Sequence, residues 1–234
     1  MKTNVSRAML NKDSLSKQIL NQLRNDVIIG KYKKGTRVLE TDLANAYGAS
    51  RGTIRFALQE LSNEGLAEFL ESGGCVIVGI DEKTAHDSYQ FRKMLETEAA
   101  EIILEKSNLI YTPMAEVLDQ YSKRESDPSF QNNPFAYCID LDLRFHQAFM
   151  EASENRPIYR AWCFLTPVIR TLLEINMTEE YYLQFTEKFY DHHKIILDYA
   201  ILHDRRILDE ISSQIKNGME MSIKNLLKYQ SKNS

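Results

Sequence analysis

The sequence has few cysteines and no long apolar segment. Three scattered cysteines, with no CxxC pair, argue against a disulfide framework. No apolar run reaches the ~18 residues that a membrane-spanning helix needs. The first residues lack the apolar core of a signal peptide. Glycine-rich phosphate loops and nucleophile motifs are also missing, which speaks against common enzyme classes. We therefore expect a folded cytoplasmic protein with no membrane segment.

The charge is distributed unevenly along the 234 residues, although the net charge of −4 is small. Residues 1–80 contain 11 Lys+Arg against 8 Asp+Glu, a net charge of +3. Residues 81–234 contain 18 against 25, a net charge of −7. A positively charged N-terminal part suits contact with phosphates, because neutralising phosphates releases counterions.

The most informative stretch, residues 40–66, predicts two short helices joined by a tight turn. Gly48 can adopt the positive φ that favours a helix end, and the hydroxyl of Ser50 can cap the second helix. At ~100° per residue, Arg51 and Arg55 lie on a different side of that helix from its apolar stripe. This is the pattern of a helix-turn-helix whose arginines reach phosphates and guanine edges. An ordinary helical hairpin with solvated arginines is the alternative.

The segments on either side of this stretch favour the helix-turn-helix. Two β-prone runs, residues 66–71 and 75–80, are joined by Ser-Gly-Gly, which suits a tight hairpin turn. Upstream, residues 14–30 carry apolar side chains on one helical face. Three helices and a C-terminal hairpin predict a winged helix-turn-helix.

The same region contains the longer motif GKYKKGTRVLETDLANAYGASRGTIRFALQELSNEGL, followed by SGGCVIVGI. This motif resembles the DNA-binding domain of the GntR family of bacterial transcription regulators over residues 14–80. The resemblance implies binding to double-stranded DNA at a palindromic operator. The DNA-contacting positions that it implies are Arg37, Ser50, Arg51, Thr53, Arg55, Gly73 and Gly74.

Three of the residues in this motif depart from the family pattern. Thr53 stands where the family usually has proline, and Phe56 stands where it often has glutamate. Gly73 replaces the basic or polar side chain often found at the wing tip, which we expect to weaken readout of the minor groove.

After residue 80 the β-prone stretches stop and helical periodicity takes over. Predicted helices span residues 82–107, 112–126, 135–151, 157–175, 179–202 and 204–228. The segment 126–134 is the longest predicted loop, and Asp204 is suited to cap the last helix. The sequence thus predicts a mainly α protein, with a winged helix-turn-helix followed by an all-helical antiparallel bundle.

Three stretches in the bundle, FRKMLETEAAEII, LDLRFHQAFMEASENRPIY and HKIILDYAILHDRRI, resemble the all-helical (FCD) effector domain of the FadR-type branch of this family. The resemblance implies residues 1–80 as a DNA-binding domain and 81–234 as an effector-binding and dimerisation domain. It further implies a homodimer, a small-molecule effector that is often a carboxylate, and a divalent metal inside the bundle.

Two polar residues interrupt an apolar helix face in the bundle. Asp142 and His146 are spaced i and i+4, so they lie on one side of the helix. A buried charge needs a partner, and a plain Asp–His hydrogen bond in the core is one solution. A metal site is the other, because carboxylate and imidazole are common ligands. His193, on another apolar stripe, supplies a third ligand, with His192 as its competitor about 100° away.

The metal set is incomplete by comparison with the family. The family pattern adds a histidine in the last helix, where this chain reads Ser-Gln-Ile-Lys-Asn over residues 213–217. We therefore expect zinc or nickel to bind through Asp142, His146 and His193 more weakly than in relatives with all the ligands.

Arg92 matches an arginine that faces the pocket in the family, where it can pair with an effector carboxylate. The alternative is a surface ion pair with Glu96 at i+4. Tyr181, Tyr182 and Phe185 belong to an aromatic cluster that we interpret as core or dimer surface.

These observations favour a ligand-responsive transcription regulator, a repressor that a small carboxylate metabolite releases from DNA, and not an enzyme. Two alternatives remain open. One is an architectural DNA-binding protein whose helical domain only dimerises. The other is a metal-dependent helical enzyme fused to a DNA-binding module.

Overall fold

The computed structural model describes the backbone of residues 2–176 and 179–232, and side chains within residues 15–176 and 188–231. The chain divides into two compact units. One contains the residues up to 82 together with those from 226 onwards, and the other contains residues 83–225. The last turns of the final helix therefore belong with the N-terminal unit, which the linear division at residue 80 does not anticipate.

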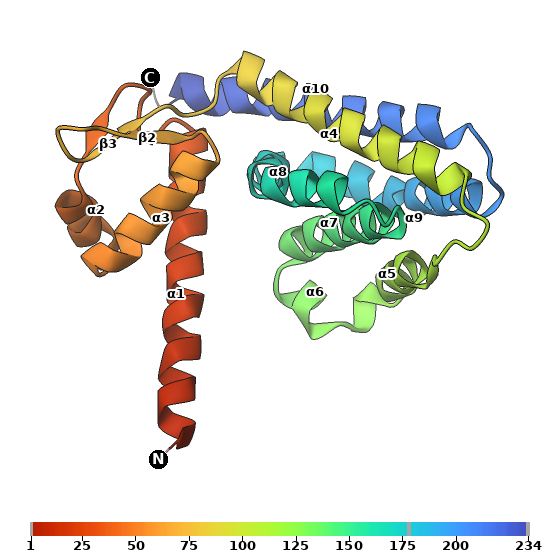
Figure 1. Ribbon diagram of the computed structural model, residues 1–234, viewed down its shortest axis with the longest axis horizontal. Helices are drawn as coiled ribbons and strands as arrows, with labels where there is room; N and C mark the ends of the chain where they lie inside the picture. The colour runs from red at the N-terminus through yellow and green to blue at the C-terminus, as the bar shows by residue number, and fades with distance from the viewer. Residues whose placement is uncertain (1, 177–178, 233–234) are drawn as a thin grey trace. The chain divides into compact units, whose positions relative to one another are not determined.

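The first unit is a winged helix-turn-helix (Figure 1). Its elements are α1 (Lys2–Ile28), β1 (Arg37–Val38), α2 (Glu40–Tyr47), α3 (Arg51–Asn63), β2 (Ala67–Phe69) and β3 (Cys75–Ile77). The strands form an antiparallel sheet in the order β1-β3-β2. Helix α1 packs chiefly against α3. The core between them is made of side chains that are fully or almost fully buried, among them Leu23, Val27, Ile28, Ile54, Leu58 and Leu61.

Two features of this unit differ from the prediction. Helix α1 begins at Lys2, twelve positions before the expected start at Ser14. Strand β1 is not among the expected elements, because its two residues become a strand only by pairing with β3, with Arg37 opposite Val76. Such pairing depends on residues far apart in the chain and leaves no periodic signal in so short a segment.

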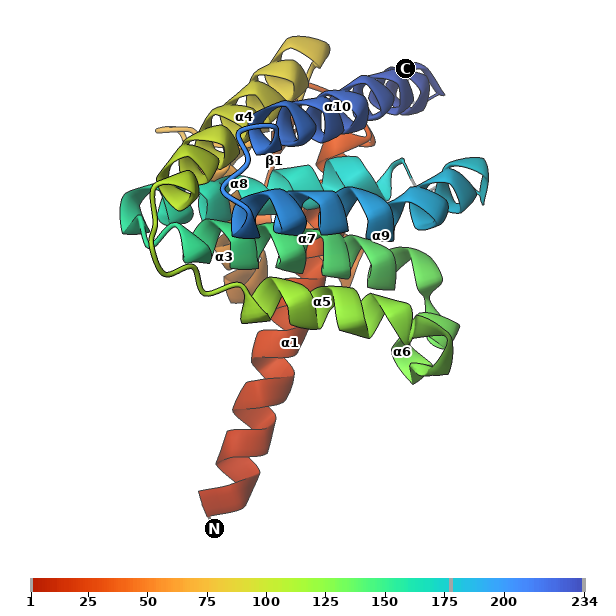
Figure 2. The ribbon, with the colours of Figure 1, turned by 90° about the vertical axis from the view of Figure 1, so that its right-hand side faces the viewer.

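The second unit is an all-helical antiparallel bundle. Its helices are α4 (Glu82–Leu104), α5 (Thr112–Ser122), α6 (Pro128–Asn132), α7 (Pro134–Ala152), α8 (Arg156–Glu174), α9 (Glu179–Ile201) and most of α10 (Ile207–Lys232). Helix α7 contacts α5, α8 and α9, so it forms the centre of the unit (Figure 2). The chain is thus mainly α, as predicted.

Two local predictions in the bundle need correction. The segment expected to be a loop contains α6, which Asp127 caps through the N–H of Ser129. A short 3-10 helix, Arg124–Ser126, precedes it. Asp204 does not cap the last helix, since α10 begins only at Ile207. Its carboxylate instead accepts the backbone N–H of Arg206 in the preceding turn.

No helix among the described residues is long and apolar enough to cross a membrane.

Candidate DNA interface and effector pocket

The turn between α2 and α3 is built by local interactions. Gly48 ends α2 in the left-handed conformation, with φ of 60°. Ser50 then caps α3, because its Oγ accepts the backbone N–H of Thr53 at 3.1 Å. Helix α3 buries Ile54, Leu58 and neighbouring apolar residues. This burial fixes which of its side chains face outwards.

Two arginines project from the exposed side of α3. The side chains of Arg51 and Arg55 are 71% and 74% exposed. Both lie near Glu40 at the start of α2, with N···O distances of 3.9 Å and 3.8 Å. Contacts this long between exposed groups are weak, so both guanidinium groups are available to a DNA backbone or base edge.

Thr53 and Phe56 are placed differently. Thr53 is only 8% exposed, and its hydroxyl lies 2.9 Å from Ser50 Oγ. It therefore supports the cap, and its contact with DNA stays a prediction. Phe56 is 45% exposed although it is apolar. An apolar ring on this helix suits contact with a thymine methyl group in the major groove.

Arg37, one of the DNA-contacting positions that the resemblance implies, anchors the wing. Arg37 Nη2 donates hydrogen bonds to Ser72 O at 3.1 Å and to Gly73 O at 2.7 Å. Gly74 has φ of 81°, and a Cβ there would lie 2.9 Å from Val38 O. Only glycine fits this close approach. Arg37 and Gly74 thus shape the wing tip, whether or not they also touch DNA.

The bundle contains a partly open cavity of about 390 Å³. Side chains from α4, α7, α8, α9 and α10 line it. Its polar lining includes Arg92, Asp142, His146, His193, Gln214 and Asn217. The volume is within the range typical of small-molecule sites, roughly 300–1,000 Å³.

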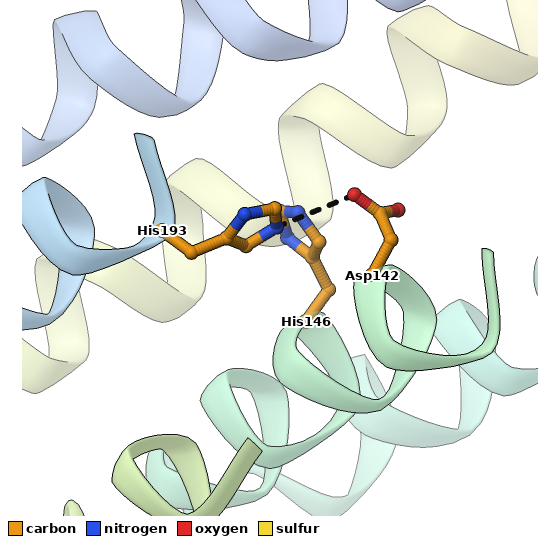
Figure 3. Close-up of side chains that lie close together, drawn as sticks. All are labelled: Asp142, His146 and His193. Carbon is orange, nitrogen blue, oxygen red and sulfur yellow. Dashed lines mark ion pairs between the residues drawn. The ribbon is translucent and has the colours of Figure 1, made fainter. Parts of the chain in front are cut away.

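Asp142, His146 and His193 line this cavity. Their side chains point toward one another (Figure 3). The first two project from α7 and the third from α9. All three side chains are buried, and one potential ligand atom from each lies within 4.8 Å of the others. The structure therefore brings together the three residues that the sequence proposed as metal ligands. His192, the competing residue, is less buried and also borders the cavity.

The hydrogen bonds of His193 determine what its second nitrogen can do. Nδ1 lies 2.7 Å from the carbonyl oxygen of Phe189, so Nδ1 carries a proton and donates it. Nε2 lies 3.3 Å from Asp142 Oδ1 and has no hydrogen-bond partner among the residues that the structure describes. Burial lowers the pKa of His193, which favours the neutral ring with a lone pair on Nε2. In that state His193 Nε2 and Asp142 Oδ1 are two acceptors whose lone pairs repel each other. A proton or a metal cation between the two atoms removes this repulsion.

Burial raises the pKa of Asp142, but a proton shared with His193 and positive charge on His146, His193 and Arg92 lower it more, so the net shift is downward. Asp142 is thus ionised at neutral pH. An ionised carboxylate beside a bare imidazole nitrogen is the donor set that binds divalent metals.

Arg92 lines the cavity. It also forms the ion pair with Glu96 that was the alternative interpretation, but this pair is buried and does not lie on the surface. Arg92 Nε donates to Glu96 Oε1 at 2.7 Å, and Arg92 and Glu96 are 5% and 0% exposed. Burial raises the pKa of Glu96, yet Arg92 and His146 offset this and hold it well below its usual range. Sequence reasoning missed Glu96 as part of the site, because only the tertiary fold reveals its burial.

Helix α10 supplies the wall where the family pattern has a further histidine. Gln214 donates to the carbonyl oxygen of His192 and to Glu210, each at 3.0 Å, so its amide nitrogen is engaged within the fold. Ile215 is 4% exposed and apolar. Neither side chain replaces an imidazole ligand. The side chains of Tyr181, Tyr182 and Phe185 lie outside the described residues.

Two family models match the chain. The model for bacterial regulatory proteins of the gntR family matches residues 15–77. The FCD domain model matches residues 87–214, more than half of the chain. The chain belongs to the GntR family. It is a GntR-type transcription regulator with an FCD effector domain, which agrees with the resemblance carried by its motifs.

Curated relatives extend the similarity over most of the GntR chain. The gluconate operon transcriptional repressor of Bacillus subtilis is 26% identical over 206 residues, covering 85% of this chain and 81% of the repressor. The uncharacterized HTH-type transcriptional regulator YdhC of Bacillus subtilis is 25% identical over 164 residues, covering 70% of this chain and 72% of YdhC.

Solved structures share the fold. Escherichia coli McbR/YncC superposes with a TM-score of 0.62 at 19% identity, covering 92% of this chain and 97% of that one. Lar of Listeria monocytogenes gives a TM-score of 0.67 at 14% identity, covering 89% and 96%.

Proposed function

We propose that this GntR-family protein is a ligand-responsive repressor that binds a palindromic operator as a homodimer. A small carboxylate, binding in the bundle cavity together with a divalent metal, releases it from DNA. The observation that carries this proposal concerns His193 Nε2, which has no hydrogen-bond partner within the described part of the chain. It faces the Asp142 carboxylate at 3.3 Å on the wall of a 390 Å³ cavity.

Zinc or nickel suits the donors, since both metals accept imidazole nitrogen and carboxylate oxygen. Asp142, His146 and His193 would hold the metal, which would supply a Lewis acid for an anionic effector oxygen. Gln214 or Ile215 stands where the resemblance implies a histidine as the fourth protein ligand, so metal should bind more weakly than in relatives with all the ligands.

A carboxylate effector agrees with the charge of the cavity. Arg92 borders the cavity, and one of its N–H groups is used by Glu96. A guanidinium has five N–H donors, so the others are able to bind a carboxylate oxygen. Gly218 also lines the cavity, and the absence of a side chain there leaves room for a ligand.

Repression is supported by the names of relatives, which include the gluconate operon transcriptional repressor. Gluconate is a hydroxy-carboxylate, so sugar acids are the first compounds to test. Because bacterial regulators act on chromosomal DNA, we propose the cytoplasm as the place of action.

The two alternative functions make different predictions. An architectural protein needs a filled core, whereas the bundle contains the cavity described above. A metal-dependent enzyme needs turnover of a substrate, and the GntR family consists of regulatory proteins.

The experiment starts with operator fragments selected from genomic DNA by the purified full-length protein. Fluorescence anisotropy then measures affinity for the operator with zinc or nickel and a panel of small carboxylates, gluconate first. We expect one carboxylate to weaken operator binding by roughly 5- to 150-fold, the usual range of allosteric coupling. His193→Ala should abolish that response while operator binding without effector persists. An affinity that no metal–carboxylate pair changes contradicts the proposal.

A further inference from the structure

We infer that Glu96 is a positioning residue of the metal site: it holds the proton of His146 on Nδ1 and so leaves Nε2 bare for the metal. Its effect on metal binding rests on the proposed function, but the position of the proton does not.

Glu96 is completely buried between α4, α7 and α8. Its two oxygens have different partners. Oε1 accepts from Arg92 Nε at 2.7 Å and from Trp162 Nε1 at 2.8 Å. Arg92 and the indole N–H are donors only, so they require an acceptor at this position.

The other oxygen points to His146. Nδ1 of His146 lies 2.8 Å from Glu96 Oε2, within ion-pair distance. The alignment falls short of a hydrogen bond, and Oε2 has no other hydrogen-bond partner in the described structure. A buried carboxylate oxygen without a donor is costly. A small ring rotation that directs Nδ1–H at Oε2 satisfies it, because His146 Nδ1 already lies within ion-pair distance of this oxygen.

A neutral imidazole carries one N–H, so a proton on Nδ1 leaves the lone pair on Nε2. His193 has the same arrangement, with Nδ1 donating to Phe189 O and Nε2 facing Asp142. Both histidines thus present Nε2 as a ligand, and each has its tautomer set by an acceptor behind it. Such supporting hydrogen bonds commonly change metal affinity by 10- to 100-fold when they are removed.

Glu96→Gln tests this assignment with almost no change in shape. Arg92 and Trp162 both donate hydrogen bonds to the Oε1 position, so the amide oxygen of the glutamine should occupy it. The NH₂ group then occupies the Oε2 position. It then donates to His146 Nδ1 and forces the proton onto Nε2, which blocks metal ligation. Trp162→Phe is the matched control, because it removes a donor to Glu96 and leaves the Glu96–His146 contact intact.

Two measurements on the full-length protein read the outcome. In the metal-free protein, long-range ¹H–¹⁵N correlation spectra identify the protonated ring nitrogen, with His146→Gln used to assign the signal. We expect Nδ1–H in the wild type and in Trp162→Phe, and Nε2–H in Glu96→Gln. Titration with nickel should give a dissociation constant roughly 10- to 100-fold weaker in Glu96→Gln than in Trp162→Phe.

If the tautomer of His146 is unchanged in Glu96→Gln, the inference is wrong, regardless of the nickel titration. If Glu96→Gln changes the tautomer of His146 but no form of the protein binds nickel, Glu96 still positions the proton. That result contradicts the proposed metal site instead. Circular dichroism melts of all variants exclude unfolding as the cause, and Trp162→Phe remains informative if Glu96→Gln does not fold. In that case, loss of the Nδ1–H signal in Trp162→Phe contradicts the inference.

Discussion

Arg51→Ala and Arg55→Ala test where the GntR protein reads DNA. Both side chains extend into solvent from α3, and each is more than two-thirds exposed. A bidentate contact with a guanine is worth about 1–3 kcal/mol. Since ~1.4 kcal/mol corresponds to a tenfold change in affinity, each substitution should weaken operator binding by about 5- to 150-fold.

Glu40 opposes these contacts only slightly. At 3.8–3.9 Å from the two guanidinium groups, it forms exposed pairs of the kind worth about 0–1 kcal/mol. Releasing the arginines to DNA therefore costs much less than a base contact gains. Glu40→Gln should tighten binding by no more than about fivefold, and on all DNA alike, because it also removes a charge that repels phosphates.

Fluorescence anisotropy on operator and scrambled duplexes at one fixed salt concentration separates base contacts from phosphate contacts. A loss confined to the operator indicates base contacts, and an equal loss on both duplexes indicates phosphate contacts. Arg205→Ala is the control, because that arginine lies in the bundle unit and is also 71% exposed. Operator affinity within twofold of wild type for both Arg51→Ala and Arg55→Ala would refute α3 as the recognition helix.

Stability, effector response and assembly each provide a further test. The Arg24–Glu64 pair is buried, with side chains 5% and 6% exposed, so Arg24→Met alone should lower the free energy of unfolding by about 3–5 kcal/mol, because it leaves a buried charge unpaired. Arg24→Met/Glu64→Leu should lose much less; equal losses in urea melts followed by circular dichroism would contradict this. Gly218→Leu should fill the cavity and abolish the effector response while operator affinity stays unchanged in anisotropy titrations; a preserved response would place the effector elsewhere. Sedimentation of the full-length protein should show a dimer at micromolar concentration, and a strict monomer would contradict the proposed assembly.

The helix-turn-helix was predictable because its signals are local. The positive φ of Gly48 and the cap at Ser50 depend only on neighbouring residues, and both occur as expected. The apolar stripe of α3 follows from helical periodicity and correctly gives its buried face. Strand β1 depends on pairing with β3, a segment distant along the chain, and its two residues carry no local signal of that pairing.

The site was predictable only in part, for the same physical reason. Helical spacing placed Asp142 and His146 on one face of α7, and the apolar stripe of α9 favoured His193 over His192. Glu96 looked like the surface partner of Arg92 because i and i+4 spacing says nothing about burial. Its contacts with Trp162 and His146 join three helices, and no local pattern encodes them.

Metal binding by the full-length protein tests the central claim most directly. Protein stripped with a chelator is titrated with nickel or zinc by calorimetry, and protein purified without chelator is dialysed and analysed for metal. We predict one metal per chain, lost on dialysis because residues 213–217 supply no histidine and leave the protein's ligand set incomplete. We also predict that His193→Ala and Asp142→Asn abolish binding. Titration that shows no binding, or equal binding by both variants and the wild type, would contradict the site. Stoichiometric metal that survives dialysis would contradict the predicted weakness.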